Sequence, residues 1–201
     1  MSERALGRTT LVLLSFAALA TAGVAQAQSA RIVALGDSNT AGFGVGSQAA
    51  FPARLEALLR SAGLDVQVLN AGISGDTTAG MLARLDDGAL PPGTGLVIVQ
   101  GGYNDLRRGG TRESIAANVE AILVRLRARG IRAVLCGFYN EPWGVLARRN
   151  GAVLVDANTC YDAKNRGFDG LHMNAAGHQV VAARLFPVVQ PLLAGPRRRR
   201  G

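Results

Sequence analysis

The sequence predicts one three-layer α/β/α domain that is built on a five-stranded parallel sheet. Five short apolar segments alternate along the chain with segments of helical periodicity, as expected for right-handed strand–helix–strand units. The third apolar segment is rich in β-branched residues, which is typical of a central parallel strand. A chain of 201 residues with 48% hydrophobic content can bury one substantial core. The expected strands comprise residues 31–35, 66–69, 96–100, 131–136 and 153–155.

Capping and stop signals delimit the expected helices. Pro52 fits a first helical turn and Gly63 a C-terminal stop. Asp76 or Thr77, then Thr111 and Asn174, are residue types that cap helix N-termini. The predicted helices comprise residues 47–62, 78–85, 112–130, 142–150 and 175–185. No repeat or internal linker divides the chain, so we expect a single domain over residues 28–194.

The N-terminus has the pattern of a secretory signal. Arg4 and Arg8 precede the apolar run 11–20, and Ala25-Gln26-Ala27 supplies small residues at a cleavage site. The run is too short for a typical transmembrane helix. We therefore predict a signal peptide over residues 1–27, export to a bacterial periplasm or medium, and no stable membrane insertion after cleavage.

Charge excludes a nucleic-acid partner. Of the formal net charge of +8, the predicted signal contributes +1 and Arg197–Arg200 contribute +4, which leaves +3 for the body. No basic stripe with interleaved aromatic residues is present, and aromatic residues make up only 5% of the chain. Residues 195–201 are expected to form a basic, disordered tail. The oligomeric state is left open.

Reactive residue types follow the predicted strands. Ser38, Gly72 and Asn104 come after the first, second and third strands, and therefore at one edge of a parallel sheet. A serine hydroxyl needs a base that is itself oriented by a third group, and Asp169 and His172 are spaced to provide both. Backbone N–H groups of Ser38 and Gly72 and the amide of Asn104 are candidate oxyanion donors.

Each of these signals is weak alone. Asp-Ser after a strand is common turn and cap chemistry, and Asp-x-x-His can be a plain loop turn before a helix cap. The chain has two histidines, and the other one, His178, falls inside the last helix, where a surface or packing role is expected. The cysteines and histidines have no metal-ligand spacing, so we expect neither a metal nor a cofactor.

Taken together, four blocks resemble the SGNH (GDSL) hydrolase superfamily. They are Gly36-Asp37-Ser38, Gly72, Gly102-Tyr103-Asn104-Asp105 and Asp169-Gly170-Leu171-His172. Residues 70–78 are similar to the bacterial periplasmic thioesterase/lysophospholipase/arylesterase branch. The resemblance implies that Ser38 is the nucleophile, His172 the base and Asp169 its partner, with Ser38, Gly72 and Asn104 as the oxyanion hole. Met173 departs from that branch, which usually has proline there, and the segment 138–164 is short.

The resemblance implies a serine esterase with a small-molecule ester substrate. Short acyl or aryl esters are the substrates that we expect first, followed by thioesters and lysophospholipids. A carbohydrate O-acetyl ester is the main alternative substrate. A catalytically silent binding protein with the same fold is a further alternative. A dinucleotide site at Gly44, Gly46 and Ala49 is disfavoured, because Asn70 stands where an acidic residue is expected. The Gly-x-Ser-x-Gly elbow of ordinary α/β-hydrolases is absent, because Thr40 stands at its last position, so that class is disfavoured.

A disulfide between Cys136 and Cys160 is a further hypothesis. Export permits it, and two cysteines is an even count. Cys136 ends the predicted fourth strand and Cys160 lies shortly after the fifth, so both fall at the same sheet edge. The alternative is that Cys136 is a small buried residue, as free cysteines often are.

Overall fold

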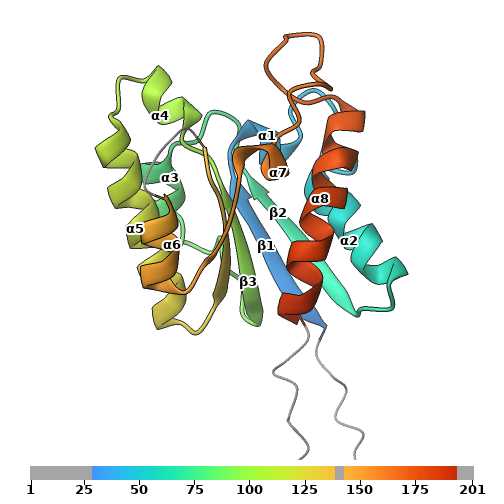
Figure 1. Cartoon of the computed structure of the whole chain (residues 1–201), viewed down its shortest axis with the longest axis horizontal. Helices are drawn as coiled ribbons and strands as arrows, with labels where there is room; N and C mark the ends of the chain where they lie inside the picture. The colour runs from blue at the N-terminus through green and yellow to red at the C-terminus, as the bar shows by residue number, and fades with distance from the viewer. Residues whose placement is uncertain (1–28, 139–142, 194–201) are drawn as a thin grey trace, which may run out of the picture.

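Five parallel strands form the centre of the molecule, in the order β2-β1-β3-β4-β5. The computed structural model describes residues 29–138 and 143–193, so the predicted signal peptide and basic tail lie outside the described residues. The strands are β1 (Ala30–Gly36), β2 (Val66–Gly72), β3 (Thr94–Gln100), β4 (Arg132–Cys136) and β5 (Val153–Val155). Helices cover both faces of this sheet (Figure 1), which confirms the predicted fold class.

One helical layer packs on each face of the sheet. The first contains α2 (Phe51–Ser61) and α8 (Ala175–Leu193). The second contains α3 (Thr78–Ala83), α5 (Arg112–Ala128) and α6 (Trp143–Asn150). Side chains of β1 alternate between the two layers, because successive residues of a strand point to opposite faces. The short helices α1 (Ser38–Ala41), α4 (Tyr103–Arg107) and α7 (Ala157–Cys160) lie in the loops that follow strands.

The register brings the carboxyl ends of the central strands together. Gly36 at the end of β1 pairs with Gly72 of β2 on one side and with Gln100 of β3 on the other. The loops after these three strands therefore start from one edge of the sheet. This is the edge at which the sequence places its reactive residue types.

Two helices differ most from their predicted bounds. The helix expected at 47–62 begins only at Phe51, because residues 42–49 form turns that include left-handed glycines. The last helix continues past residue 185 to Leu193, through Pro187 and Pro191. Its buried face, which includes Val189, packs against α2 and keeps the helix intact where proline alone would end it. Within the described ranges, no helix is long and apolar enough to cross a membrane.

Candidate active site

Ser38 sits where β1 turns sharply into α1. Asp37 caps this helix by accepting the Asn39 N–H at 3.0 Å, and Ser38 is the first helical residue. The turn needs glycine at position 36, since a Cβ there would lie 2.1 Å from Thr40 Oγ1 and 2.7 Å from the Gln100 carbonyl oxygen. Ser38 is 9% exposed, so its hydroxyl faces the pocket rather than bulk solvent.

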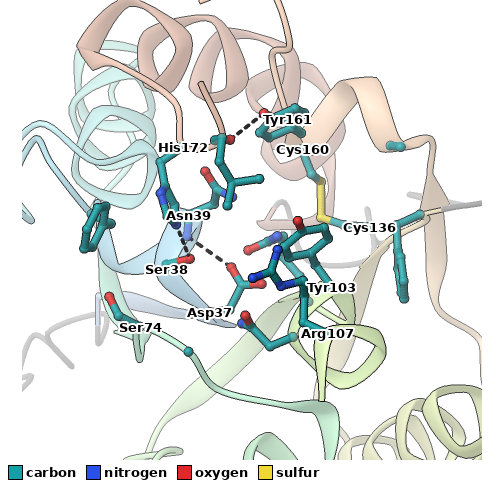
Figure 2. A pocket seen from close by; sticks show the side chains of 18 of the residues that line it. Asp37, Ser38, Asn39, Ser74, Tyr103, Arg107, Cys136, Cys160, Tyr161 and His172 are labelled. Atoms are coloured by element: carbon teal, nitrogen blue, oxygen red, sulfur yellow. Dashed lines mark hydrogen bonds between the residues drawn. A yellow bond between two sulfur atoms is a disulfide. The ribbon is translucent and has the colours of Figure 1, made fainter. Parts of the chain in front are cut away.

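His172 connects Ser38 to Asp169. His172 Nε2 lies 2.8 Å from Ser38 Oγ, and Nδ1 lies 2.5 Å from Asp169 Oδ2. Figure 2 shows the ring directed at the serine hydroxyl. A proton on Nδ1, donated to the carboxylate, leaves Nε2 free to accept from Ser38. The structure thus brings together the three residues that the sequence singled out.

The carboxylate of Asp169 is held in its charged form. Its hydrogen bonds to the His172 ring and to the N–H groups of His172 and Leu171 lower the pKa of Asp169 to about 2. Hydrogen bonds to a carboxylate favour the ionised state. At neutral pH this aspartate is therefore a negatively charged acceptor for the imidazole.

Side chains from other segments hold the loop that carries His172. The Phe43 ring packs against the imidazole at a tilt of 38°, with centroids 4.4 Å apart. Asn39 Oδ1 accepts the Met173 N–H at 3.3 Å, and the Tyr161 hydroxyl donates to the Leu171 carbonyl at 2.6 Å. Met173 itself is buried and accepts the Asp162 N–H through its sulfur, so this departure from the family pattern serves packing.

The structure does not bring Gly72 to the cavity. Its N–H donates to Asn70 Oδ1 at 3.0 Å, and it is not part of the pocket lining. A Cβ at Gly72 would lie 2.2 Å from the Ala41 backbone nitrogen, so this glycine permits close packing of β2 against α1. Its role is structural, because the register places it at the last strand pair rather than in the loop beyond.

Gly75, three residues further on, faces the pocket instead. Asp76 N–H donates to the Ile73 carbonyl at 3.0 Å, and Gly75 occupies the left-handed position of this turn with φ 81°. Its N–H forms no hydrogen bond within the described chain, and Gly75 lines the pocket together with Ser38 and Asn104. The glycine-rich loop signalled such a turn, but the sequence alone did not tell which glycine reaches the site.

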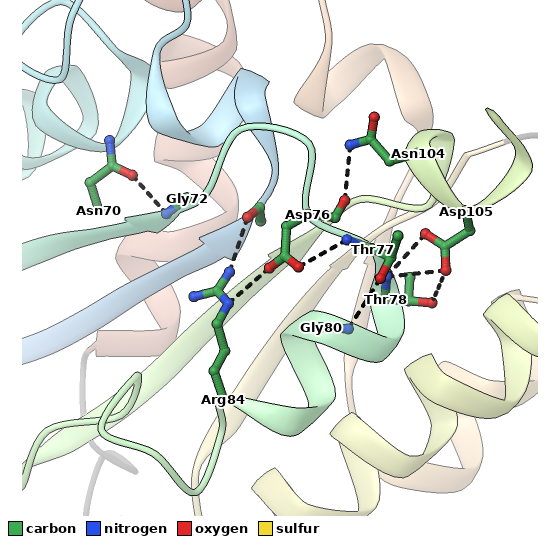
Figure 3. A network of polar contacts seen from close by, with 10 residues as sticks. Asn70, Gly72, Asp76, Thr77, Thr78, Gly80, Arg84, Asn104 and Asp105 are labelled. Atoms are coloured by element: carbon green, nitrogen blue, oxygen red, sulfur yellow. Dashed lines mark hydrogen bonds and ion pairs between the residues drawn. The ribbon is translucent and has the colours of Figure 1, made fainter. Parts of the chain in front are cut away.

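A buried polar network fixes the loops that carry Gly75 and Asn104 (Figure 3). Asn104 Nδ2 donates to the Asp76 carbonyl at 2.9 Å, which leaves its second N–H available. Arg84 pairs with Asp76 at 2.8 Å and donates to the Gly36 carbonyl at 3.1 Å. Asp105, 6% exposed, accepts the Thr78 N–H and hydroxyl. The loops after β1, β2 and β3 are therefore tied into one unit.

The site opens into a cavity of about 700 Å³. A disulfide between Cys136 and Cys160 forms part of its wall, beside Phe138 and Tyr161. Asp37 is also at this wall, and burial raises its pKa to about 6. No group of three or more metal-ligating side chains occurs among the described residues.

His178 takes no part in the cavity. It is fully buried in α8, and its Nδ1 accepts the Phe51 N–H at 3.2 Å, at a helix start that has no side-chain cap of its own. Burial lowers the pKa of His178 to about 4, so the ring is neutral. Of the two roles expected for it, packing is the one the structure supports.

The fold and this site are those of a hydrolase that acts on ester bonds. The chain belongs to the GDSL-like lipase/acylhydrolase family, whose model matches residues 34–180. The predicted SGNH (GDSL) resemblance is thereby confirmed.

Similar proteins that are named as esterases or thioesterases support this assignment. Esterase TesA of Pseudomonas aeruginosa is 30% identical over 184 residues, which cover 84% of this chain and 92% of that protein. Thioesterase 1/protease 1/lysophospholipase L1 of Escherichia coli K12 is 35% identical over 202 residues, with 91% and 90% covered. The crystal structure of AlinE4, an SGNH-hydrolase family esterase, matches with a TM-score of 0.64 and 32% identity, over 83% of this chain and 97% of that one.

Proposed function

We propose that this enzyme is a serine esterase in which Ser38 attacks the ester carbonyl, His172 is the general base and Asp169 orients the histidine. The observation that carries the proposal is the contact of 2.8 Å between His172 Nε2 and Ser38 Oγ, with Asp169 on the opposite ring nitrogen. This is the relation that an activated serine requires.

The reaction proceeds through an acyl-enzyme. The Ser38 hydroxyl proton passes to His172 Nε2 as Oγ bonds to the carbonyl carbon, and the carbonyl oxygen becomes an oxyanion. His172 then gives this proton to the leaving alcohol oxygen as the ester C–O bond breaks. A water molecule then attacks the acyl carbon while His172 takes one of its protons. His172 gives this proton to Ser38 Oγ as the bond between the acyl carbon and Oγ breaks and the carboxylic acid leaves.

Three donors are available for the oxyanion: the N–H groups of Ser38 and Gly75 and the second amide N–H of Asn104. Ser38 N is at the first position of α1, where no intrahelical acceptor exists. All three residues line the same cavity. Donors held in place before the reaction stabilise the developing charge without reorganising.

Short acyl or aryl esters are the proposed substrates, with thioesters and lysophospholipids next. The similar proteins are named esterase and thioesterase/lysophospholipase, which supports these bond types. The apolar cavity wall, which includes Phe138 and the disulfide, suits an acyl or aryl group. We also propose export to the periplasm or medium, on the basis of the N-terminal sequence pattern.

Labelling with a fluorophosphonate and hydrolysis of a 4-nitrophenyl ester test the assignment. Ser38→Ala is expected to lose both the label and the turnover, and His172→Ala the turnover, while circular dichroism stays unchanged. Ser61→Ala is the matched control, because Ser61 is exposed at the end of α2, where its hydroxyl bonds only to the Leu58 carbonyl. Most activity remaining in Ser38→Ala or His172→Ala would overturn the triad.

A further inference from the structure

Two arginines that line the cavity have no ion-pair partner among the residues that the structure describes. Arg107 belongs to α4, and Arg166 belongs to the loop between α7 and α8. Neither guanidinium forms an ion pair or a hydrogen bond with the part of the chain that the structure describes. Other arginines do, such as Arg84 with Asp76 and Arg149 with Glu120. Within residues 29–138 and 143–193, the two positive charges at the cavity are therefore not used in ion pairs.

Among the described residues that line the cavity, no exposed carboxylate is available to neutralise them. Asp37 is the only acidic residue in the described lining, and it is 3% exposed. Its carboxylate instead accepts the Asn39 N–H and a hydrogen bond from Gln100. The positive charge of the arginines thus faces the space that a substrate enters.

The rest of the wall is largely apolar and aromatic. Figure 2 shows Arg107 beside Tyr103, on the side of the site that faces the disulfide. Phe138, Tyr161 and Leu171 also line the cavity. Arg107 and Arg166 are both exposed, so each can bind a carboxylate or phosphate through charge-assisted hydrogen bonds that water and salt partly screen.

We propose that the natural substrate is an anionic ester, and that Arg107 and Arg166 bind its carboxylate or phosphate while Ser38 attacks its ester carbon. This inference rests on the proposed function, since it assigns a substrate class to the cavity of Ser38. The two arginines come from separate segments of the chain and line the same cavity. Binding of this kind selects among esters without taking part in the bond-breaking steps.

A pair of esters that differ only in charge tests the carboxylate form. The measurement is kcat/KM for 4-nitrophenyl hydrogen adipate and for its methyl ester, at low ionic strength and corrected for spontaneous hydrolysis. We expect the wild type to prefer the anionic ester by about tenfold, the order expected of one or two charge-assisted contacts. Added salt is expected to reduce the preference, because it screens exposed charges.

Variants then assign the preference to the two arginines. Arg107→Gln and Arg166→Gln are each expected to lower the anionic-to-neutral ratio about three- to fivefold, and the double variant to bring it to about one. Arg54→Gln removes the same charge from an exposed position of α2 away from the cavity, and is expected to leave both rates unchanged.

The phosphate form is tested with a lysophosphatidate and the monoacylglycerol of the same acyl chain, assayed by fatty-acid release. The larger of the two charge preferences identifies the anionic group. A wild-type ratio of about one for both pairs, or a ratio that the double variant keeps, overturns the proposal. Such a result leaves the proposed function standing if Ser38→Ala still abolishes hydrolysis of the neutral ester.

Discussion

On the side of Asn104 the site rests on buried polar groups, whereas on the side of His172 it rests on an exposed loop. Thr78 and Asp105 are 1% and 6% exposed, and they tie two loops to the sheet edge. Phe168, next to Asp169, is 87% exposed. The comparison shows that the candidate oxyanion donors are fixed by the core, while the base is positioned by hydrogen bonds within its own loop and a few contacts to neighbours.

Among the variants that follow, Asp169→Asn should have the largest effect, mainly on activity. An amide at position 169 can donate to His172 Nδ1, which places the ring proton on Nε2 and removes the acceptor for Ser38. We expect kcat to fall by about 10³–10⁴. Because the loop is exposed, the melting temperature at neutral pH should fall only slightly, by the stabilisation that the ionised Asp169 provides. A loss below tenfold would contradict the role of Asp169.

Asn104→Ala should lower kcat by about 10²–10³ with a smaller change in KM, because the amide acts mainly on the transition state. Asn118→Ala is the matched control, since Asn118 donates to Thr78 Oγ1 in the same network but does not line the cavity. It should reduce stability with little loss of kcat. An unchanged kcat in Asn104→Ala would place the third donor elsewhere.

The disulfide connects the sheet to the histidine side of the site. Cys136 ends β4, and Cys160 precedes Tyr161, which contacts the histidine loop. Removing the disulfide should cost up to about 3.5 kcal/mol of unfolding free energy on the chain-entropy estimate. We expect Cys136→Ala, Cys160→Ala and the double variant to lose similar amounts in urea unfolding. Single losses that add up in the double variant would show that the thiols are not bonded.

Asp37 and Asp169 should respond to pH in opposite ways. The raised pKa of Asp37 means that the folded state binds more protons than the unfolded state between about 4 and 6, so this group lowers stability as pH rises through that range. The effect is at most about 3 kcal/mol. Asp37→Asn should remove this slope from the unfolding free energy. An unaltered slope would show that Asp37 titrates normally.

The lowered pKa of Asp169 acts in the other direction. Its stabilisation is present above the unfolded value of about 4 and is lost as pH falls toward 2. Asp169→Asn should flatten the stability curve only in that acidic range. A pair of pH titrations of the two variants thus distinguishes the contribution of buried Asp37 to stability from that of Asp169 in the exposed loop.

The order of strands and helices could be predicted because it depends on local periodicity and caps. Thr77, Thr111 and Asn174 accept N–H groups at or near the helix starts that the sequence indicated. The end of α8 could not be predicted, since Pro187 and Pro191 are local stop signals that packing against α2 overrides. The position of Gly72 outside the cavity could not be predicted either, because the strand register, which decides where the loop begins, depends on pairing with β1.

The sequence by itself determined the fold class, the family and the residues Ser38, Asn104, Asp169 and His172 as the chemistry-bearing set. Residue type and spacing are enough for this, because they specify local structure and the carboxyl ends of parallel strands share an edge. Only the tertiary structure decided that Gly75 faces the cavity and that Phe43 packs against His172. It also decided that Arg107 and Arg166 line the same cavity. These facts depend on contacts between segments far apart in the chain, which local sequence patterns do not specify.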